Sequence, residues 1–124
     1  MYIPYNPNPM NKKTDDCAVR ALTKALDKTW EEVYIDLCLK GLEMCDWGNN
    51  NAVIDDYLSG KGFTREIVPN TCPDCYTVND FCNDHQNGTY VVGTGTHLMT
   101  TVDGNLFDSY DSGSLIPIYA YRKG

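Results

Sequence analysis

Residues 14–22 read Thr14-Asp15-Asp16-Cys17-Ala18-Val19-Arg20-Ala21-Leu22, a pattern typical of the start of an amphipathic helix. Thr14, Asp15 and Asp16 can each cap a helix, because their side-chain oxygens accept a hydrogen bond from an unpaired backbone N–H. The apolar residues that recur at helical spacing are Ala18, Val19, Ala21, Leu22, Ala25 and Leu26. The pattern predicts a helix over residues 17–28 that begins at Cys17 and buries one face.

A cysteine in the first turn of a helix has two interpretations. The unpaired N–H groups and the positive end of the helix dipole stabilise a thiolate, so the pKa of Cys17 is expected to be low. A thiolate is a nucleophile, and Cys17 is therefore a catalytic candidate if a histidine can reach it. Free cysteine is also among the most buried residue types, so the alternative is a small apolar residue in a core helix.

A β-hairpin is predicted around Asp103-Gly104, a dipeptide that between two strand-like runs indicates a type I′ turn. With this turn, Met99 lies opposite Asp108 and His97 lies opposite Tyr110. Because side chains alternate between the two faces of a strand, His97 and Asp108 become diagonal neighbours on one face. The carboxylate would then be close enough to orient the imidazole. The alternative is a solvated cross-strand pair.

The order of these residues, a cysteine at a helix start, then a histidine, then an aspartate across a hairpin, resembles that of papain-like cysteine peptidases. The resemblance is closer to short bacterial and phage-borne papain-like proteins and extends over most of the chain. The stretches that carry it are Asp15–Ala21, Thr71–Val78, Gly88–Tyr90, Thr96–His97, Val102–Gly104 and Asp108–Gly113.

The resemblance implies an α+β fold in which N-terminal helices pack on a C-terminal antiparallel β-sheet. It also implies that Cys17 is the nucleophile, that His97 is the general base and acid, and that Asp108 orients the imidazole. Papain-like enzymes carry a glutamine six residues before the nucleophile, and its amide helps to form the oxyanion hole. Asn11 stands at that position here, and Ala18 stands where a tryptophan often follows the cysteine.

The composition indicates one globular domain. The chain has 124 residues, enough for a single compact domain over 1–124 with a proline-rich, extended arm at 1–13. Apolar residues make up 42% and charged residues 22%, which excludes a disordered chain. The net charge of −7 argues against nucleic acid as a partner, because an acidic surface repels phosphates. Such a surface would suit a basic substrate or would serve solubility alone.

The compartment is predicted from segments that the sequence lacks. No apolar run approaches the roughly 18 residues that cross a membrane. Residues 1–9 show no basic region followed by an apolar stretch, so no signal peptide is predicted. We therefore expect a cytoplasmic protein without membrane contact, whose six cysteines are reduced thiols.

The remaining elements follow from local signals. A capping box at Thr29 and Glu32 starts a second helix, which is expected to end at Gly41. The residues of this helix expected in the core are Trp30, Val33, Tyr34, Leu37 and Cys38. Further helices are expected over about 51–58, capped by one of the asparagines at 49–51, and over 77–85. Strands are expected at 63–68, 89–93 and 116–121, the last at a sheet edge or starting at its proline. Helices that precede strands predict an α+β fold.

A second group of residues has the chemistry of a zinc site. Cys72 and Cys75 form a Cys-x-x-Cys pair, and Cys82 and His85 are spaced to share one helix face. These four side chains could hold a structural zinc ion, the only cofactor that the sequence suggests. Alternatively, Cys82 packs in the core and the other two cysteines are turn residues, or they form a redox pair.

The leading functional prediction is a thiol hydrolase that cleaves a peptide, isopeptide or amide bond of a peptide or protein substrate through a Cys17 thioester. The alternative is a catalytically weak or inactive papain-like interaction protein of phage or mobile-element origin. A third functional prediction is a small zinc-binding module. Trp47 either rims a substrate groove or closes an edge of the core.

Overall fold

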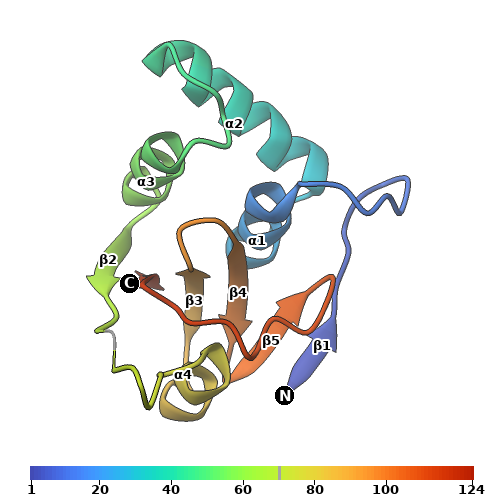
Figure 1. The fold of residues 1–124 in the computed structure, drawn as a ribbon. Coiled ribbons are helices and arrows are strands. Elements are labelled where there is room, and N and C mark those ends of the chain that lie inside the picture. The colour runs from blue at the N-terminus through green and yellow to red at the C-terminus, as the bar shows by residue number, and fades with distance from the viewer. Residues whose placement is uncertain (70) are drawn as a thin grey trace.

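The computed structural model describes residues 1–69 and 71–124, and within them the chain forms four helices and six strands (Figure 1). The helices are α1 (Cys17–Leu26), α2 (Trp30–Met44), α3 (Asn51–Gly60) and α4 (Val78–Asp84). The strands are β1 (Tyr2–Pro4), β2 (Phe63–Ile67), β3 (Thr89–Gly93), β4 (Leu98–Val102), β5 (Asn105–Asp108) and β6 (Tyr119–Lys123). The α+β class predicted from the order of elements is confirmed. No helix in this part of the chain is long and apolar enough to cross a membrane.

The strands form one sheet in the order β1-β5-β4-β3-β6-β2. The sheet is mixed, because β1 pairs with β5 in parallel while the other neighbours are antiparallel. The prediction of a purely antiparallel C-terminal sheet is therefore wrong in one respect. The extended arm contributes β1, and the carbonyl of Met1, just before this strand, accepts a hydrogen bond from the backbone N–H of Leu106 at 2.9 Å. Such a strand forms only where a free sheet edge is offered to it.

The sheet has an apolar cluster on each face. Val91 belongs to one cluster and Val92 to the other. Because successive strand residues point to opposite faces, the two clusters lie on opposite sides of the sheet. Leu22 of α1 and Leu58 of α3 pack in the first cluster, and Phe81 of α4 packs in the second. Figure 1 shows α4 apart from the other three helices.

Helix α1 and the β4–β5 hairpin form as predicted. Asp103 and Gly104 have φ values of 51° and 80°, as a type I′ turn requires, and Val102 pairs with Asn105. The hydroxyl of Thr100 in β4 donates to the carbonyl of Ala21 in α1 at 2.6 Å. This contact ties the helix that begins at Cys17 to the strand that follows His97.

Helix α2 begins as predicted but ends later. The capping box is confirmed, with the Thr29 hydroxyl accepting from the Glu32 N–H and the Glu32 carboxylate accepting from the Thr29 N–H. The helix continues through Gly41 and is capped by Cys45 in the left-handed conformation. A glycine is needed at position 41 for packing and not to end the helix. A Cβ there would lie 2.6 Å from the carbonyl oxygen of Asp46, because the turn after α2 folds back onto the helix.

Two residues of α2 expected in the core are not buried. Val33 and Leu37 are 0% and 3% exposed, as predicted, but Tyr34 is 50% exposed and Cys38 is also exposed. The α1 and α3 helices cover α2 on one side only. Val33 and Leu37 lie on the covered side, whereas Tyr34 and Cys38 do not. The core prediction is wrong for Tyr34 and Cys38.

The later elements largely follow their local signals. Asn50 caps α3 and Thr77 caps α4, the latter in a capping box with Asp80. Strand β6 starts after Pro117, three residues later than the strand predicted from 116. It lies between β3 and β2 rather than at a sheet edge, and Pro117 precedes the strand by two residues, so neither predicted position of the proline is adopted.

Candidate active site

Cys17 is the first residue of α1, and its thiol is half-buried. Burial by itself would raise the pKa of the thiol. A hydrogen bond with His97, a backbone hydrogen bond with Leu98 and the positive charges of His97 and Arg20 outweigh burial, so the pKa of Cys17 is lowered. The helix start acts in the same direction, since its unpaired N–H groups favour a negative charge. The surroundings of Cys17 therefore favour the thiolate more than those of an ordinary cysteine do.

His97 lies in the turn immediately before β4. Its backbone N–H donates to the Thr94 hydroxyl at 3.1 Å, and its carbonyl accepts from the Thr94 N–H at 3.0 Å, which fixes the turn. The ring Nε2 donates to Asp108 Oδ2 at 2.7 Å, which leaves Nδ1 for Cys17. Burial of the ring would lower its pKa, but the hydrogen bonds with Asp108 and Cys17 raise the pKa of His97 to about 9. The imidazole is thus held as a cation.

Asp108 ends β5 and is fully buried, with 0% exposure. Its Oδ2 accepts from His97 and from the Ser112 hydroxyl at 2.6 Å. Its Oδ1 accepts from Arg20 Nη2 at 3.0 Å and from the Ser109 N–H at 2.7 Å. Burial would raise the pKa of this carboxyl, but the hydrogen bonds from His97, Ser112 and the Ser109 N–H and the charge of His97 lower it. The structure therefore brings together the three predicted catalytic residues in the order Cys17, His97, Asp108.

Arg20 is a further member of the site that the sequence analysis missed. Its guanidinium is buried and bridges two carboxylates, with Nη2 on Asp108 and Nη1 on Asp16 at 2.5 Å. The second oxygen of Asp16 accepts from Trp30 Nε1 at 2.9 Å. Asp16 occupies the N-cap position, but its side chain caps no helix N–H. The signal that could have identified this pair is the i, i+4 spacing of Asp16 and Arg20.

A cavity of about 880 Å³ opens beside Cys17 and His97. Its walls come from the segment before α1, from the asparagines before α3 and from the segments on either side of the hairpin. The lining residues include Thr14, Cys17, Asn49, Ile54, His97 and Tyr110. The Tyr110 ring lies 5.1 Å from the His97 ring, centroid to centroid. An extended substrate can therefore reach the thiol from an open surface.

Asn11, the predicted oxyanion donor, does not line this cavity. Its side chain is exposed, its φ is 52°, and its Oδ1 accepts from Asn6 Nδ2 at 3.4 Å. The arm between Tyr5 and α1 loops outward and carries Asn11 with it (Figure 1). The oxyanion role of Asn11 stays a prediction that this placement does not support.

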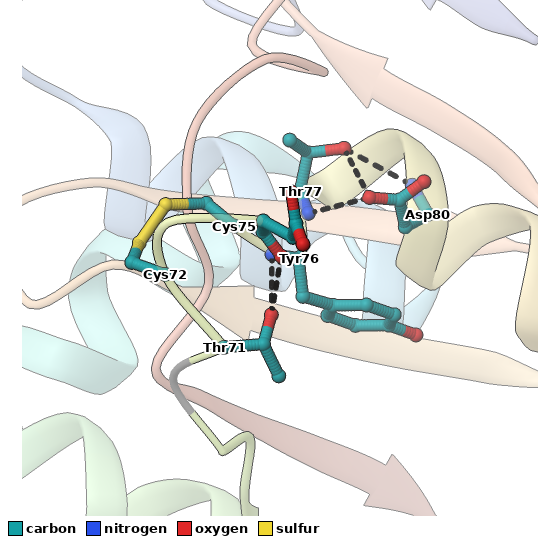
Figure 2. Close-up of a disulfide and its surroundings, with 7 residues drawn as sticks. Thr71, Cys72, Cys75, Tyr76, Thr77 and Asp80 are labelled. Atoms are coloured by element: carbon teal, nitrogen blue, oxygen red, sulfur yellow. Dashed lines mark hydrogen bonds between the residues drawn. A yellow bond between two sulfur atoms is a disulfide. The ribbon is translucent and has the colours of Figure 1, made fainter.

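The four predicted zinc ligands do not form one site. Cys72 and Cys75 are joined by a disulfide in a turn closed by the Thr71 hydroxyl, which accepts from the Tyr76 N–H (Figure 2). The prediction that all six cysteines are free thiols is therefore wrong for this pair, because the tight turn brings the two side chains together.

The other two candidate ligands belong to α4 and its cap. Cys82 is 4% exposed in the core, and His85 Nδ1 lies 2.8 Å from the Phe81 carbonyl oxygen, with its ring stacked on the Phe81 ring. Among residues 1–69 and 71–124 there is no group of His, Cys, Asp and Glu side chains able to hold a metal.

Trp47 is 81% exposed and lies in the turn after α2. The alternative prediction that Trp47 closes an edge of the core is therefore wrong. It lines a groove beside the catalytic cavity instead.

Comparison with known proteins returned no relative. No family model matches the chain, and neither a curated protein nor a solved structure matches it. The resemblance to papain-like peptidases therefore rests on the motifs and on the placement of Cys17, His97 and Asp108, and it stays a prediction.

Proposed function

We propose that this protein is a thiol hydrolase that cleaves an amide bond, in a peptide or isopeptide linkage, by a papain-like mechanism. The observation that carries the proposal is the position of the His97 ring, which is hydrogen-bonded to Cys17 on one side and to the buried Asp108 on the other. Nucleophile, acid–base group and orienting carboxylate are the three parts that such a reaction needs.

In the first step, Cys17 Sγ attacks the carbonyl carbon and a C–S bond forms. The C–N bond then breaks, and the leaving nitrogen takes the proton from His97 Nδ1. In the second step, His97 accepts a proton from water, whose oxygen attacks the thioester, and the C–S bond breaks to release the acid. The backbone N–H of Cys17 is an unpaired donor at the helix start and is suited to stabilise the oxyanion.

The first prediction concerns the thiolate. Iodoacetamide at about pH 6 should alkylate Cys17 on the order of tenfold faster than Cys38 and Cys45, because the lowered pKa of Cys17 leaves a larger fraction of it as the reactive thiolate. His97→Ala should abolish the difference, because the imidazolium that lowers the Cys17 pKa is gone. Mass spectrometry of the labelled peptides measures each rate separately.

The control is His85→Ala, which removes the chain's other histidine and should leave the Cys17 rate unchanged. The free, exposed Cys38 and Cys45 serve as references within the same molecule. A wild-type Cys17 that reacts no faster than Cys38 contradicts the hydrolase proposal.

A second candidate is a catalytically weak interaction protein with the same fold. Two observations favour it: Asn11 lies away from the cavity, and α2 exposes several large apolar side chains. These are Tyr34, Ile35, Leu39 and Leu42. An ordinary Cys17 reactivity in the alkylation experiment would favour this candidate over the hydrolase.

A cytosolic location is part of the hydrolase proposal. Four of the six cysteines are free, among them Cys17, and a catalytic thiol must stay reduced. By contrast, the disulfide between Cys72 and Cys75 argues for an oxidising compartment.

A further inference from the structure

A second cavity, of about 730 Å³, lies beside the catalytic cavity and is lined mostly by apolar side chains. Its walls are the loop before α1, the start of α2 and the turn after α2. The apolar residues that line it include Met10, Val19, Trp30, Tyr34, Leu37 and Trp47. Met10 and Trp47 are 75% and 81% exposed, so the groove presents large apolar side chains to water. We call it the Trp47 groove.

The walls of the Trp47 groove are held in place. The turn that carries Trp47 packs against α2 so closely that a Cβ on Gly48 would lie 2.7 Å from the Leu37 carbonyl oxygen. On the opposite wall, Tyr34 stacks on Trp30 with 5.1 Å between ring centroids. Trp30 is fixed in turn by its hydrogen bond to Asp16. The rings of Trp30 and Tyr34 are therefore positioned before any ligand arrives, which reduces the entropy cost of binding.

The groove and the catalytic cavity are neighbours, because Thr14, Asp15 and Asn49 line both of them. A chain bound at Cys17 would therefore have to extend only across these residues to place a side chain in the Trp47 groove. A substrate side chain that covered the apolar lining would gain free energy, because apolar surface would leave water.

We propose that the Trp47 groove is a specificity subsite that receives a large apolar side chain, aromatic or long aliphatic, of the polypeptide substrate. The inference rests on the proposed function, because it takes the ligand to be the substrate of Cys17. The charged residues that line the groove are Lys12, Asp15, Asp16 and Glu31, and this excess of carboxylates disfavours an acidic side chain there.

The binding test uses the intrinsic fluorescence of the protein, because the chain has two tryptophans and both line the groove. A Cys17→Ala variant is titrated with two blocked hexapeptides of equal charge, which differ only in one phenylalanine or serine. The phenylalanine peptide should shift the emission and bind about tenfold more tightly, as burial of its ring requires.

Two substitutions on α2 locate the binding. Tyr34→Ala removes part of the groove wall and should abolish the tenfold preference. Leu42→Ala removes an apolar side chain that is 76% exposed on the same helix but does not line the groove, and it should change nothing. Equal binding of the two peptides, or a preference that survives Tyr34→Ala, overturns the proposal.

A second measurement tests whether the ligand approaches Cys17. In the wild type, the phenylalanine peptide at saturation should slow alkylation of Cys17 at least about fivefold, while the serine peptide at the same concentration should not. Binding without this protection overturns the role as a substrate subsite. Dimerisation in sedimentation experiments that Tyr34→Ala abolishes also overturns it, because the occupant is then a second copy of the chain.

The two proposals fail in different experiments. An unreactive Cys17 in the absence of peptide contradicts the hydrolase proposal. The fluorescence titration would then still show whether the groove binds peptides, but the groove would no longer be a subsite of an enzyme. A reactive Cys17 without a fluorescence preference contradicts the subsite alone.

Discussion

Asp108 is a carboxylate with no exposure to water, and four donors make its charge tolerable. A buried carboxylate without such partners would take up a proton, because burial penalises the charged form. With its pKa lowered instead, Asp108 keeps its negative charge at neutral pH and holds the His97 ring as a cation. The pair is therefore an electrostatic unit that orients the ring and stabilises its proton.

This unit predicts a pH-dependent contribution of His97 to stability. The folded protein keeps the His97 proton to about pH 9, whereas the unfolded chain releases it near the ordinary value of 6.5. The protonated His97 therefore stabilises the folded state by on the order of 3 kcal/mol below pH 6.5, and this stabilisation is lost as the pH rises to 9. Urea unfolding of wild type and His97→Gln across this range measures it.

The difference in free energy of unfolding between these two proteins should be largest in acid and should shrink toward alkaline pH. His85→Gln is the matched control, because it removes the chain's other histidine and leaves the His97–Asp108 pair in place. A constant difference between wild type and His97→Gln would show that the proton on His97 is not linked to folding.

At the scale of elements, the contact between α2 and the turn that follows it builds the Trp47 groove. Two glycines permit this contact. Gly41 on the helix and Gly48 in the turn each leave room for the backbone of the other segment. The glycine that looked like a helix end thus serves the packing of the turn, and the helix runs on to Met44.

Gly48→Ala should therefore lower the free energy of unfolding by about 1–3 kcal/mol, because the new methyl group meets backbone that has to move. Gly60→Ala is the matched control. It adds the same methyl group at the end of α3 with nothing within 4 Å, and it should stabilise the protein by up to about 1 kcal/mol. Urea unfolding of both variants checks the pair, and a Gly48→Ala protein as stable as wild type contradicts the packing argument.

At the scale of the whole molecule, the N-terminal strand supports Asp108, a candidate catalytic residue from the far end of the chain. Pro4 lies beside Asp108 in the sheet, and the Tyr5 N–H donates to the Asp108 carbonyl oxygen at 2.8 Å. The Tyr2 hydroxyl donates to the same oxygen at 3.2 Å. The backbone of Asp108 is thus anchored by β1 while its side chain is anchored by α1.

Tyr5→Pro should weaken this anchor, because proline has no N–H to donate. Tyr5→Ala is the control, since it removes the ring and its edge contact with Phe107 but keeps the N–H. Tyr5→Pro should be less stable than Tyr5→Ala by about 1 kcal/mol, the net value of one hydrogen bond. Urea unfolding compares the two, and equal stabilities would mean that this hydrogen bond does not support the strand.

The parts of this molecule that were predicted correctly depend on near neighbours in the chain. The helix start at Cys17, the capping boxes at Thr29 and Thr77 and the turn at Asp103-Gly104 all arise from interactions within a few residues. The hairpin turn also sets the register of its strands, and this register places His97 and Asp108 on one face.

The misses involve partners that are distant in sequence. Arg20 looked like an ordinary helix residue, and only the packing of α1 on the sheet places its guanidinium on Asp108. The strand β1 needed the free edge of β5, and the arm that carries Asn11 takes a course that no local signal encodes. The proposed zinc set failed because spacing alone did not say that Cys82 would be buried and that Cys72 would pair with Cys75.

The sequence by itself determined the α+β class, most of the elements and the identity of the three candidate catalytic residues, because short-range hydrogen bonds and hydrophobic periodicity are written in consecutive residues. Only the tertiary structure decided the buried contact of Arg20 with Asp108, the strand order and the cavity beside Cys17. Each of these depends on contacts between segments far apart in the chain, whose geometry exists only once the core has packed.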